Sequence, residues 1–179
     1  YWPKFKSVAV NVSIDGLHDI YEYIRGNGKF ADIEHNIKEM KKIPTVSRIV
    51  GAFTVQANNI LQIDKVIDYF LRDMEIIFYS HRVNYPRALS AQVLPDALKQ
   101  GVIEKLESMK GKIKDYPIIQ RHPVLEKITL RQIQDNINFL QAKDLHHFWD
   151  DCVDFNKKLD LSRKQGPFEK INPEFAAYV

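Results

Sequence analysis

Cysteine is nearly absent from this sequence, and its scarcity excludes several classes of site. Cys152 is the only cysteine among the 179 residues. A single thiol cannot form an internal disulfide or a Cys-x-x-Cys metal site. It also cannot hold an iron–sulfur cluster within this chain, because such clusters are bound by several thiolates.

Long apolar runs and strong charge are absent as well. No stretch approaches the ~20 apolar residues of a membrane-spanning helix, and no signal-peptide pattern opens the chain. The formal net charge is only +3, which is too little by itself to indicate nucleic acid binding. We therefore expect a cytoplasmic protein with no membrane or nucleic-acid partner.

Phosphate-binding motifs, internal repeats and low-complexity stretches are missing too. Neither G-x-G-x-x-G nor a Walker motif occurs, so a nucleotide-binding α/β enzyme of those classes lacks support. What is present is globular, because 45% hydrophobic and 27% charged residues allow a sizeable core. The length suits one domain, and the start at Tyr1 without an initiator methionine predicts a chain cut from a longer one.

Residues 8–15 predict a strand that ends at Gly16. One face of this strand is purely aliphatic, and the other becomes polar toward the carboxyl end. The aliphatic face holds Val8, Val10, Val12 and Ile14, and the other holds Ala9, Asn11, Ser13 and Asp15. Such a strand is typical of a parallel α/β barrel, in which one face packs on helices and the other carries chemistry at the carboxyl-end rim.

The first half of the chain alternates strands and helices. A loop with tight glycine turns is predicted over 16–28. Apolar periodicity then predicts a helix over 30–43, a strand over 47–56, a helix over 60–73 and a strand over 75–83. This spacing indicates parallel strands joined by right-handed crossovers.

The second half is predicted to be helical. One helix follows Leu94-Pro95 and runs to about Lys110, a second follows a capping box at Thr129 and Gln132, and a third spans about 144–159. We therefore divide the chain into an α/β segment, 1–90, and a helical C-terminal extension, 91–179.

Three parallel strands with two helices leave one sheet face and one edge without a partner. The uncovered face is predicted to carry Asn11, Ser13, Thr54 and Gln56. Either the C-terminal helices cover it or a separate piece completes a barrel. We favour the separate piece.

A short motif carries a family resemblance. The stretch Val12-Ser13-Ile14-Asp15-Gly16, followed by Glu22-Tyr23-Ile24-Arg25 and Lys29-Phe30, resembles the fourth strand of radical S-adenosylmethionine (SAM) enzymes. The next two predicted strands resemble the fifth and sixth. Softer similarity over 83–90, 159–163 and 172–175 resembles the branch with a C-terminal twitch or SPASM-type extension.

The resemblance implies both a fold and an activity. The fold is α/β, with 1–90 forming the C-terminal half of a partial (β/α)6 TIM-type barrel and 91–179 a helical extension. The activity is cleavage of SAM to a 5′-deoxyadenosyl radical for hydrogen abstraction, with a peptide as the expected substrate. The family's Cys-x3-Cys-x2-Cys loop for a 4Fe-4S cluster is absent, so the resemblance predicts a cysteine-bearing N-terminal half, in the same protein or a separate chain.

The resemblance also implies which residues bind the cofactor. Ser13 would hydrogen-bond SAM, and Arg25 would grip its carboxylate with two N–H donors. Asp15 would accept from a hydroxyl or cap the following turn, and Asn58 would reach cofactor or substrate from the second strand. Without the family context, these side chains read as turn residues and a surface charge. No catalytic residue and no metal ligand is assigned.

Two histidine features have ordinary explanations beside functional ones. His81, at the end of the third strand, suits proton transfer, but a structural or exposed histidine is the commoner case. Adjacent His146 and His147 would point about 100° apart on a helix, which favours a solvated surface over a metal site. The main alternative to the enzyme is a cofactor-free half barrel that acts as a scaffold or docks a partner.

Overall fold

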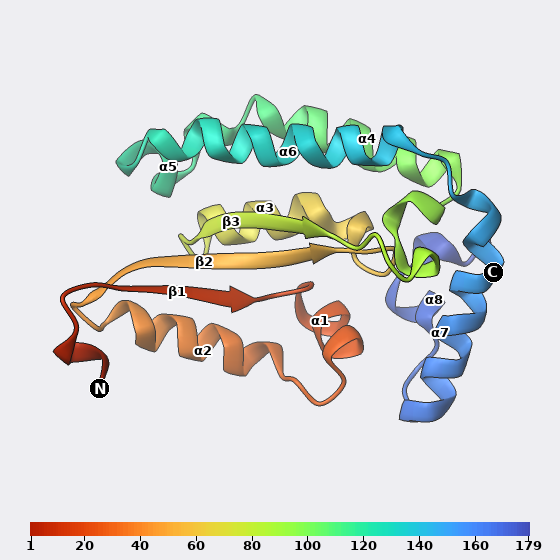
Figure 1. Cartoon of the computed structure of the whole chain (residues 1–179), viewed down its shortest axis with the longest axis horizontal. Coiled ribbons are helices and arrows are strands. Elements are labelled where there is room, and N and C mark those ends of the chain that lie inside the picture. Colours follow the sequence, from red (N-terminus) through yellow and green to blue (C-terminus); the bar gives the residue numbers. More distant parts are fainter.

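The computed structural model describes all 179 residues and is organised around a three-stranded parallel sheet in the order β1–β2–β3. The strands are β1 (Val8–Ser13), β2 (Val46–Val55) and β3 (Ile77–Arg82). Helix α2 (Phe30–Lys41) joins the first two strands, and α3 (Ile63–Arg72) joins the last two (Figure 1). The predicted strand–helix–strand–helix–strand order and the parallel pairing are confirmed.

The segment predicted as a loop over 16–28 contains a helix instead, α1 (His18–Arg25). Its glycines lie at its two ends. A Cβ on Gly16 would lie 2.5 Å from the Ile20 methyl, so this residue allows the helix to start against the strand tip. Gly26 ends the helix with φ of 68°, a conformation that favours glycine. The prediction of a loop was wrong because α1 is short and bounded by the turn residues that the pattern emphasised.

The two faces of the sheet differ in exposure. On one face, Phe53 and Phe78 are fully buried, and Gly51 lets the Phe70 ring of α3 approach the sheet. A Cβ on Gly51 would lie 2.3 Å from that ring. On the opposite face, Asn11, Ser13, Tyr79 and His81 are exposed. One layer of helices therefore covers one face of the sheet, and the other face stays open.

The remaining helices pack beside and beyond the sheet rather than over its open face (Figure 1). They are α4 (Asp96–Lys110), α5 (Pro117–Arg121), α6 (Val124–Ala142), α7 (Trp149–Arg163) and α8 (Phe168–Ile171). Single 3₁₀ turns occupy Trp2–Lys4, Ile60–Gln62, Arg87–Leu89, Ala91–Val93, Ile113–Asp115, His146–Phe148 and Pro173–Phe175. Helix α6 lies alongside β3, and α4 packs on α6 and α3, whereas α7 and α8 lie at the carboxyl ends of the strands.

Helix α6 covers the outer edge of β3. Its Gln132 side-chain oxygen accepts hydrogen bonds from the Ser80 backbone N–H and hydroxyl, both at 2.9 Å. Asn136 donates to the same hydroxyl at 2.9 Å. The predicted capping box at Thr129 was wrong, because α6 starts five residues earlier, at Val124, and places both box residues inside the helix. Gln132 therefore accepts hydrogen bonds from the edge of β3 and does not cap the start of α6.

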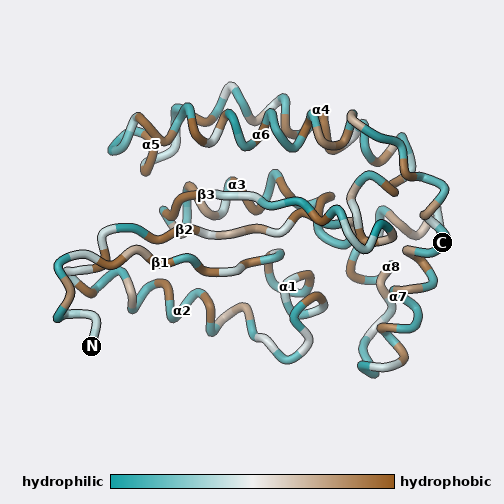
Figure 2. The backbone as a smooth tube through the Cα atoms, in the orientation of Figure 1, coloured by the Kyte–Doolittle hydropathy of each residue, from teal (hydrophilic) through white to brown (hydrophobic).

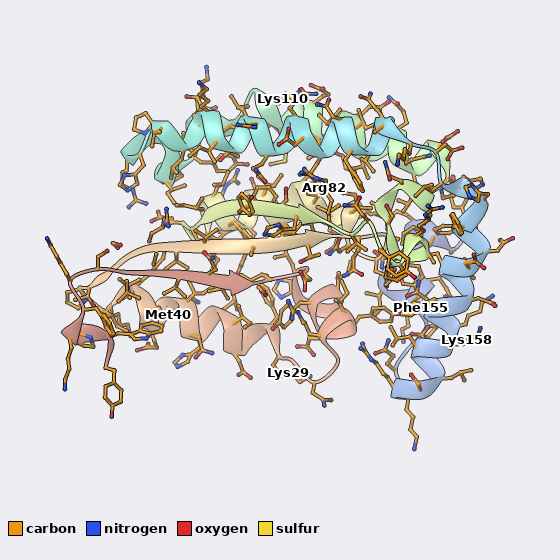
Figure 3. All side chains as sticks on the ribbon, viewed as in Figure 1. Lys29, Met40, Arg82, Lys110, Phe155 and Lys158 are labelled. Carbon is orange, nitrogen blue, oxygen red and sulfur yellow. The ribbon has the colours of Figure 1, made fainter.

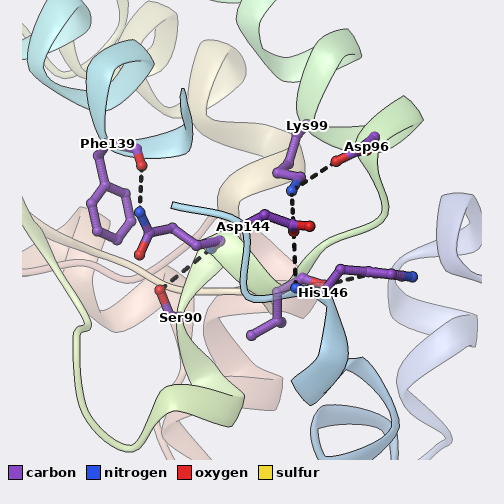
Figure 4. Close-up of polar contacts among 8 residues, drawn as sticks. Ser90, Asp96, Lys99, Phe139, Asp144 and His146 are labelled. Carbon is purple, nitrogen blue, oxygen red and sulfur yellow. Dashed lines mark hydrogen bonds and ion pairs between the residues drawn. The ribbon is translucent and has the colours of Figure 1, made fainter. Parts of the chain in front are cut away.

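A polar cluster fixes the start of α4 to the turn after α6 (Figure 4). The Lys99 ammonium, with only 8% of its side chain exposed, lies 2.8 Å from Asp96 and 3.0 Å from Asp144. Asp144 also accepts from the His146 backbone N–H at 3.0 Å. Desolvation lowers the pKa of Lys99, but the two carboxylates outweigh it and the net shift is upward. The nearly buried cation is therefore held charged.

One hydrophobic cluster of 37 buried residues runs through both segments of the chain. It includes Phe53 and Phe78 from the sheet, and Ile133, Trp149 and Phe175 from the C-terminal helices. The segments 1–90 and 91–179 therefore share a core, and their division as functional units stays a prediction. None of the helices combines the length and apolar character needed to cross a membrane.

Candidate functional site

Polar side chains gather where the parallel strands end, at the rim that faces α1 and α7. Hydropathy along β3 changes from apolar at its start to polar at its end (Figure 2), as the sequence from Ile77 to Arg82 dictates. Ser13 ends β1 and Asp15 follows two residues later. In parallel α/β sheets, ligands bind outside this end of the strands. This rim is therefore the candidate site.

Asp15 is the buried centre of the rim. Its side chain is 7% exposed, and its Oδ2 forms an ion pair with Arg25 Nη2 at 2.5 Å. Its Oδ1 accepts from the backbone N–H of Thr54 at 3.0 Å. Both carboxylate oxygens are thus engaged within the chain, one by α1 and one by β2. Asp15 positions Arg25 and joins two strand ends.

Arg25 keeps donors available for a ligand despite this pair. Its side chain is 38% exposed, and the ion pair to Asp15 is the contact that holds it at the strand end. A guanidinium has five N–H donors in a planar fork, so one engaged nitrogen leaves the others free to meet a second carboxylate. Arg25 is therefore anchored at the rim rather than loose in solvent.

Ser13 lies on the open face, as the sequence predicts. It is exposed and is the last residue of β1, with Ala52 as its partner in β2. No hydrogen bond occupies its hydroxyl. Ser13 and the Asp15–Arg25 pair therefore lie at the same strand end, with the hydroxyl free to bind a group on the open face.

Asn59 is the rim residue that sequence reasoning missed. It is fully buried, and its side-chain nitrogen donates to the carbonyls of Asp15 and Thr54, both at 2.9 Å. Its Oδ1 accepts from the Gln56 N–H at 2.9 Å. One asparagine thus clamps the end of β1 to the end of β2. The sequence indicates only that two asparagines, Asn58 and Asn59, directly follow a predicted strand. It does not indicate which of the two side chains bonds to the ends of the strands.

Asn58, the predicted cofactor contact, belongs to a buried amide network instead. It exchanges hydrogen bonds with Asn156 of α7, donating at 2.7 Å and accepting at 3.2 Å. Tyr23 donates to Asn156 at 3.2 Å, and Asn172 donates to the Asn58 carbonyl at 3.2 Å. Asn58 is 3% exposed. This network fastens α7 to the sheet, and we therefore do not carry Asn58 into the cofactor proposal.

Cys152 is not arranged as a metal ligand. It is fully buried in α7, beside the amide of Asn156. Burial raises the pKa of its thiol to about 12, with a smaller opposing effect from Asn156. Metals bind the thiolate, so a neutral thiol in an apolar setting is a poor ligand. No group of three or more histidine, cysteine or acidic side chains in the chain is placed to hold a metal ion.

The histidines singled out in the sequence lie in two different elements, His81 in β3 and the pair His146-His147 in a 3₁₀ turn. His81 is exposed on the open face, and its ring meets that of Tyr79 edge-on at 4.8 Å between centroids. His146 and His147 lie in a 3₁₀ turn before α7, where His146 contacts the Val93 carbonyl at 3.4 Å. His81 is therefore the one whose ring borders the open face, and no partner holds it for proton transfer.

Comparisons with protein-family models, curated proteins and solved structures found no match to this chain. The fold by itself defines an α/β protein with a three-stranded parallel sheet and a helical C-terminal half. The more specific resemblance to radical SAM enzymes rests on the sequence alone, most strongly on the segment from Ser13 to Arg25.

Proposed function

We propose that this chain is the C-terminal part of a radical SAM enzyme of the twitch-containing kind, and that it contributes half of a SAM site. The other half, with three cysteines and the 4Fe-4S cluster, would come from a preceding segment or a separate chain. When both groups are bound, SAM supplies the radical that removes hydrogen from the substrate, for which a peptide is our expectation.

The observation that carries the proposal is the open sheet face ending in a polar rim. Asn11 and Ser13 are exposed on this face, although they alternate with half-buried valines of the same strand. The unpaired edge of β1 borders the same face, because β1 pairs only with β2. A partial barrel is stable only when such edges and faces are paired or covered. This supports a missing partner with further strands.

The residues present fit one end of the cofactor. Ser13 offers a free hydroxyl at the end of β1, and Arg25, held at the same strand end by Asp15, offers unused N–H donors. Asp15 is 7% exposed and already has one contact at each oxygen, so its main part would be to hold the guanidinium in place. A guanidinium whose position is already fixed loses less freedom when it binds a carboxylate. In this chain, Ser13 and Arg25 would bind and orient, and Asp15 would position.

The cluster ligands must lie outside these 179 residues for the proposal to hold. Cys152 is the only cysteine, is fully buried, and lies behind the rim in the amide network. The chain alone is then unable to generate a radical.

The proposal is tested by supplying the missing half. The chain is co-expressed with a polypeptide that carries the Cys-x3-Cys-x2-Cys segment encoded upstream of Tyr1 or beside it, and 5′-deoxyadenosine is measured after anaerobic reduction with SAM. We expect product only when both halves are present. Ser13→Ala and Arg25→Lys should each weaken SAM binding by about tenfold, roughly one hydrogen bond to a charged group. Arg131→Ala, on the exposed face of α6, is the control and should leave binding unchanged.

A cofactor-free scaffold is the second candidate, and one observation favours it. The contacts of the Asp15–Arg25 pair and of the Asn59 clamp are all made between groups of this chain and tie the strand ends together. Such a scaffold should associate with the cysteine-bearing half without binding SAM. Isothermal titration of SAM into the assembled complex separates the two: heat of binding that depends on Ser13 supports the enzyme, and association without it supports the scaffold.

A further inference from the structure

A groove of about 470 Å³ lies at the opposite end of the sheet from the SAM rim, where the strands begin. It is bordered by the end of α2, the first residues of β2 and β3, and the α5–α6 junction. Figure 1 shows these elements at the amino ends of the strands. None of the residues in the proposed SAM site lies at this end of the sheet. The groove is therefore considered as a separate binding site.

Cationic side chains dominate the charge of the groove. The cations are Lys41 and Arg48, together with Arg121, and the one carboxylate is Glu75. Arg121 and Glu75 pair with each other. Lys41 and Arg48 have no ion-pair partner, although neighbouring Lys42 pairs with Glu39 at 2.5 Å. The groove therefore carries two positive charges, those of Lys41 and Arg48, that no ion pair of the chain neutralises.

The ammonium of Lys41 is already in an unfavourable setting. Although Lys41 is exposed, partial burial lowers the pKa of its ammonium, Glu75 raises it in part, and Arg121 lowers it further. A cation that loses hydration and lies near another cation gains from a nearby anion. The charge that complements this groove is negative.

The floor of the groove is aliphatic. Ile49, Ile118 and Leu125 are buried along it, and Ile77 is half-buried. Val124, at the start of α6, is 70% exposed and adds accessible apolar surface beside this floor. A ligand that bound here would cover apolar surface as well as meet positive charge.

We propose that this groove binds an acidic peptide segment carrying aliphatic side chains. Carboxylates of the peptide would meet Arg48 and Lys41, and its aliphatic side chains would cover Val124 and the isoleucine floor. A groove whose two unpaired cations are exposed suits an extended segment that lies across it, because small-molecule sites enclose most of their ligand. Arg48 would give the more specific contact, because its planar fork matches a carboxylate and the lysine acts as a point charge. This site is independent of the SAM site, which lies at the other strand ends.

The test is isothermal titration of the full chain with the acetylated, amidated hexapeptide Glu-Leu-Glu-Ile-Glu-Leu. Two matched peptides replace its glutamates with glutamine or with lysine. Arg48→Glu and Lys41→Glu reverse one charge each in the groove. Lys158→Glu makes the same change on α7, at the far end of the molecule (Figure 3), where the side chain is 78% exposed. Circular dichroism melts confirm that each variant is folded.

We expect the acidic peptide to bind and the lysine peptide not to bind. Each groove variant should weaken binding by about fivefold or more, the Lys158 variant should bind as the parent does, and raising the salt concentration should weaken binding. Equal binding of all three peptides, no binding of the acidic one, or equal loss with Lys158→Glu would overturn the proposal. Binding of octanoate with no binding of the peptide would also overturn it, because the groove would then serve a small amphiphile.

Discussion

At the scale of single residues, Asp15 is the side chain on which the rim depends. It holds Arg25 of α1 with one oxygen and the Thr54 N–H of β2 with the other. Asp15→Ala should lower the free energy of unfolding by about 1–3 kcal/mol, since a buried backbone donor loses its acceptor. The ion pair adds little to this figure, because Arg25 is partly exposed and solvent screens it. Urea denaturation at neutral pH measures the change.

The control for this substitution is another aspartate in an ion pair. Asp154 lies 3.8 Å from Lys158 on the surface of α7, with 70% of its side chain exposed. Asp154→Ala should change stability by no more than about 0.5 kcal/mol. Equal losses from the two variants would contradict the structural role of Asp15.

Asn156 gives a second residue-scale prediction. Its side chain meets Asn58 and Tyr23, and it is 1% exposed. Asn156→Ala should cost about 2–3 kcal/mol, because two buried polar partners lose a hydrogen bond at once. Tyr23→Phe removes only one of these bonds and should cost about 1 kcal/mol. Chemical denaturation of both variants checks the order, which would be wrong if Tyr23→Phe were the more damaging change.

The buried thiol of Cys152 makes the stability of the fold depend on pH in the alkaline range. Its thiol has a pKa of about 12 in the folded chain against the usual 9.0, because burial disfavours the thiolate. Above pH ~9 the unfolded state gives up this proton and the folded state keeps it, so stability falls as pH rises from 9 toward 12. The fall should be shallower in Cys152→Ala, as measured by urea midpoints. At pH 8, a disulfide reagent such as dithiobis(nitrobenzoate) should label the thiol slowly unless the chain is unfolded.

The candidate site could be read from the sequence only in part. Ser13 and Asp15 alternate with the valines of β1, so their place at a strand end follows from a period of two residues. The partner of Asp15 could not be derived from that period, because Arg25 reaches it from a helix that had been predicted as a loop. Asn59 and Asn156 are 97 positions apart in the chain, and asparagine has no pattern that marks a buried clamp or network.

At the scale of elements, two glycines differ in how closely neighbouring side chains pack against them. Gly51 of β2 faces Phe70 of α3, and a Cβ there would lie 2.3 Å from the ring. Gly101 lies inside α4, and a Cβ there would meet nothing within 4 Å. Gly51→Ala should therefore destabilise the chain by about 1–3 kcal/mol through overpacking. Gly101→Ala should stabilise it by up to about 1 kcal/mol, because alanine is the better helix former.

Thermal melts of the two glycine variants check this prediction, and the two melting temperatures should move in opposite directions. A shift in the same direction for both would mean that α3 does not pack on the sheet as closely as the structure has it.

Elements whose apolar residues recur at regular spacing were predicted well. Features that depend on contacts between distant parts of the chain were not. The strands over 46–55 and 77–82 and helices α2 and α3 follow from apolar spacing that local residues determine. Helix α6 begins at Val124, and neither Thr129 nor Gln132 caps it. Gln132 is instead matched to Ser80, 52 residues away, and such a match between a helix and a strand edge leaves no local signature.

At the scale of the whole molecule, the sheet has one closed and one free edge. Helix α6 covers β3, whereas the outward backbone groups of β1 have no strand beside them. Val8 and Ile14 donate toward β2, so the alternating residues Ala9, Asn11 and Ser13 point their backbone groups outward. An isolated chain with such an edge should associate with a second copy through β1.

Association through this edge must stop at two chains, because each chain offers a single free edge. Analytical ultracentrifugation over a range of concentrations should therefore show a monomer–dimer equilibrium without larger species. Ala9→Lys places a charge on the edge and should shift the equilibrium to monomer, whereas Lys158→Glu should not. Growth into longer assemblies would contradict the closure of the β3 edge.

The Asn59 clamp has a thermodynamic consequence for any ligand of the rim. Because it ties the ends of β1 and β2 together within the chain, the rim is already ordered before a ligand arrives. Binding there would then order few backbone residues, and its heat capacity change would reflect only the surface that the ligand itself covers. A preordered binding surface of this kind selects ligands by shape complementarity, because its backbone does not rearrange for each ligand.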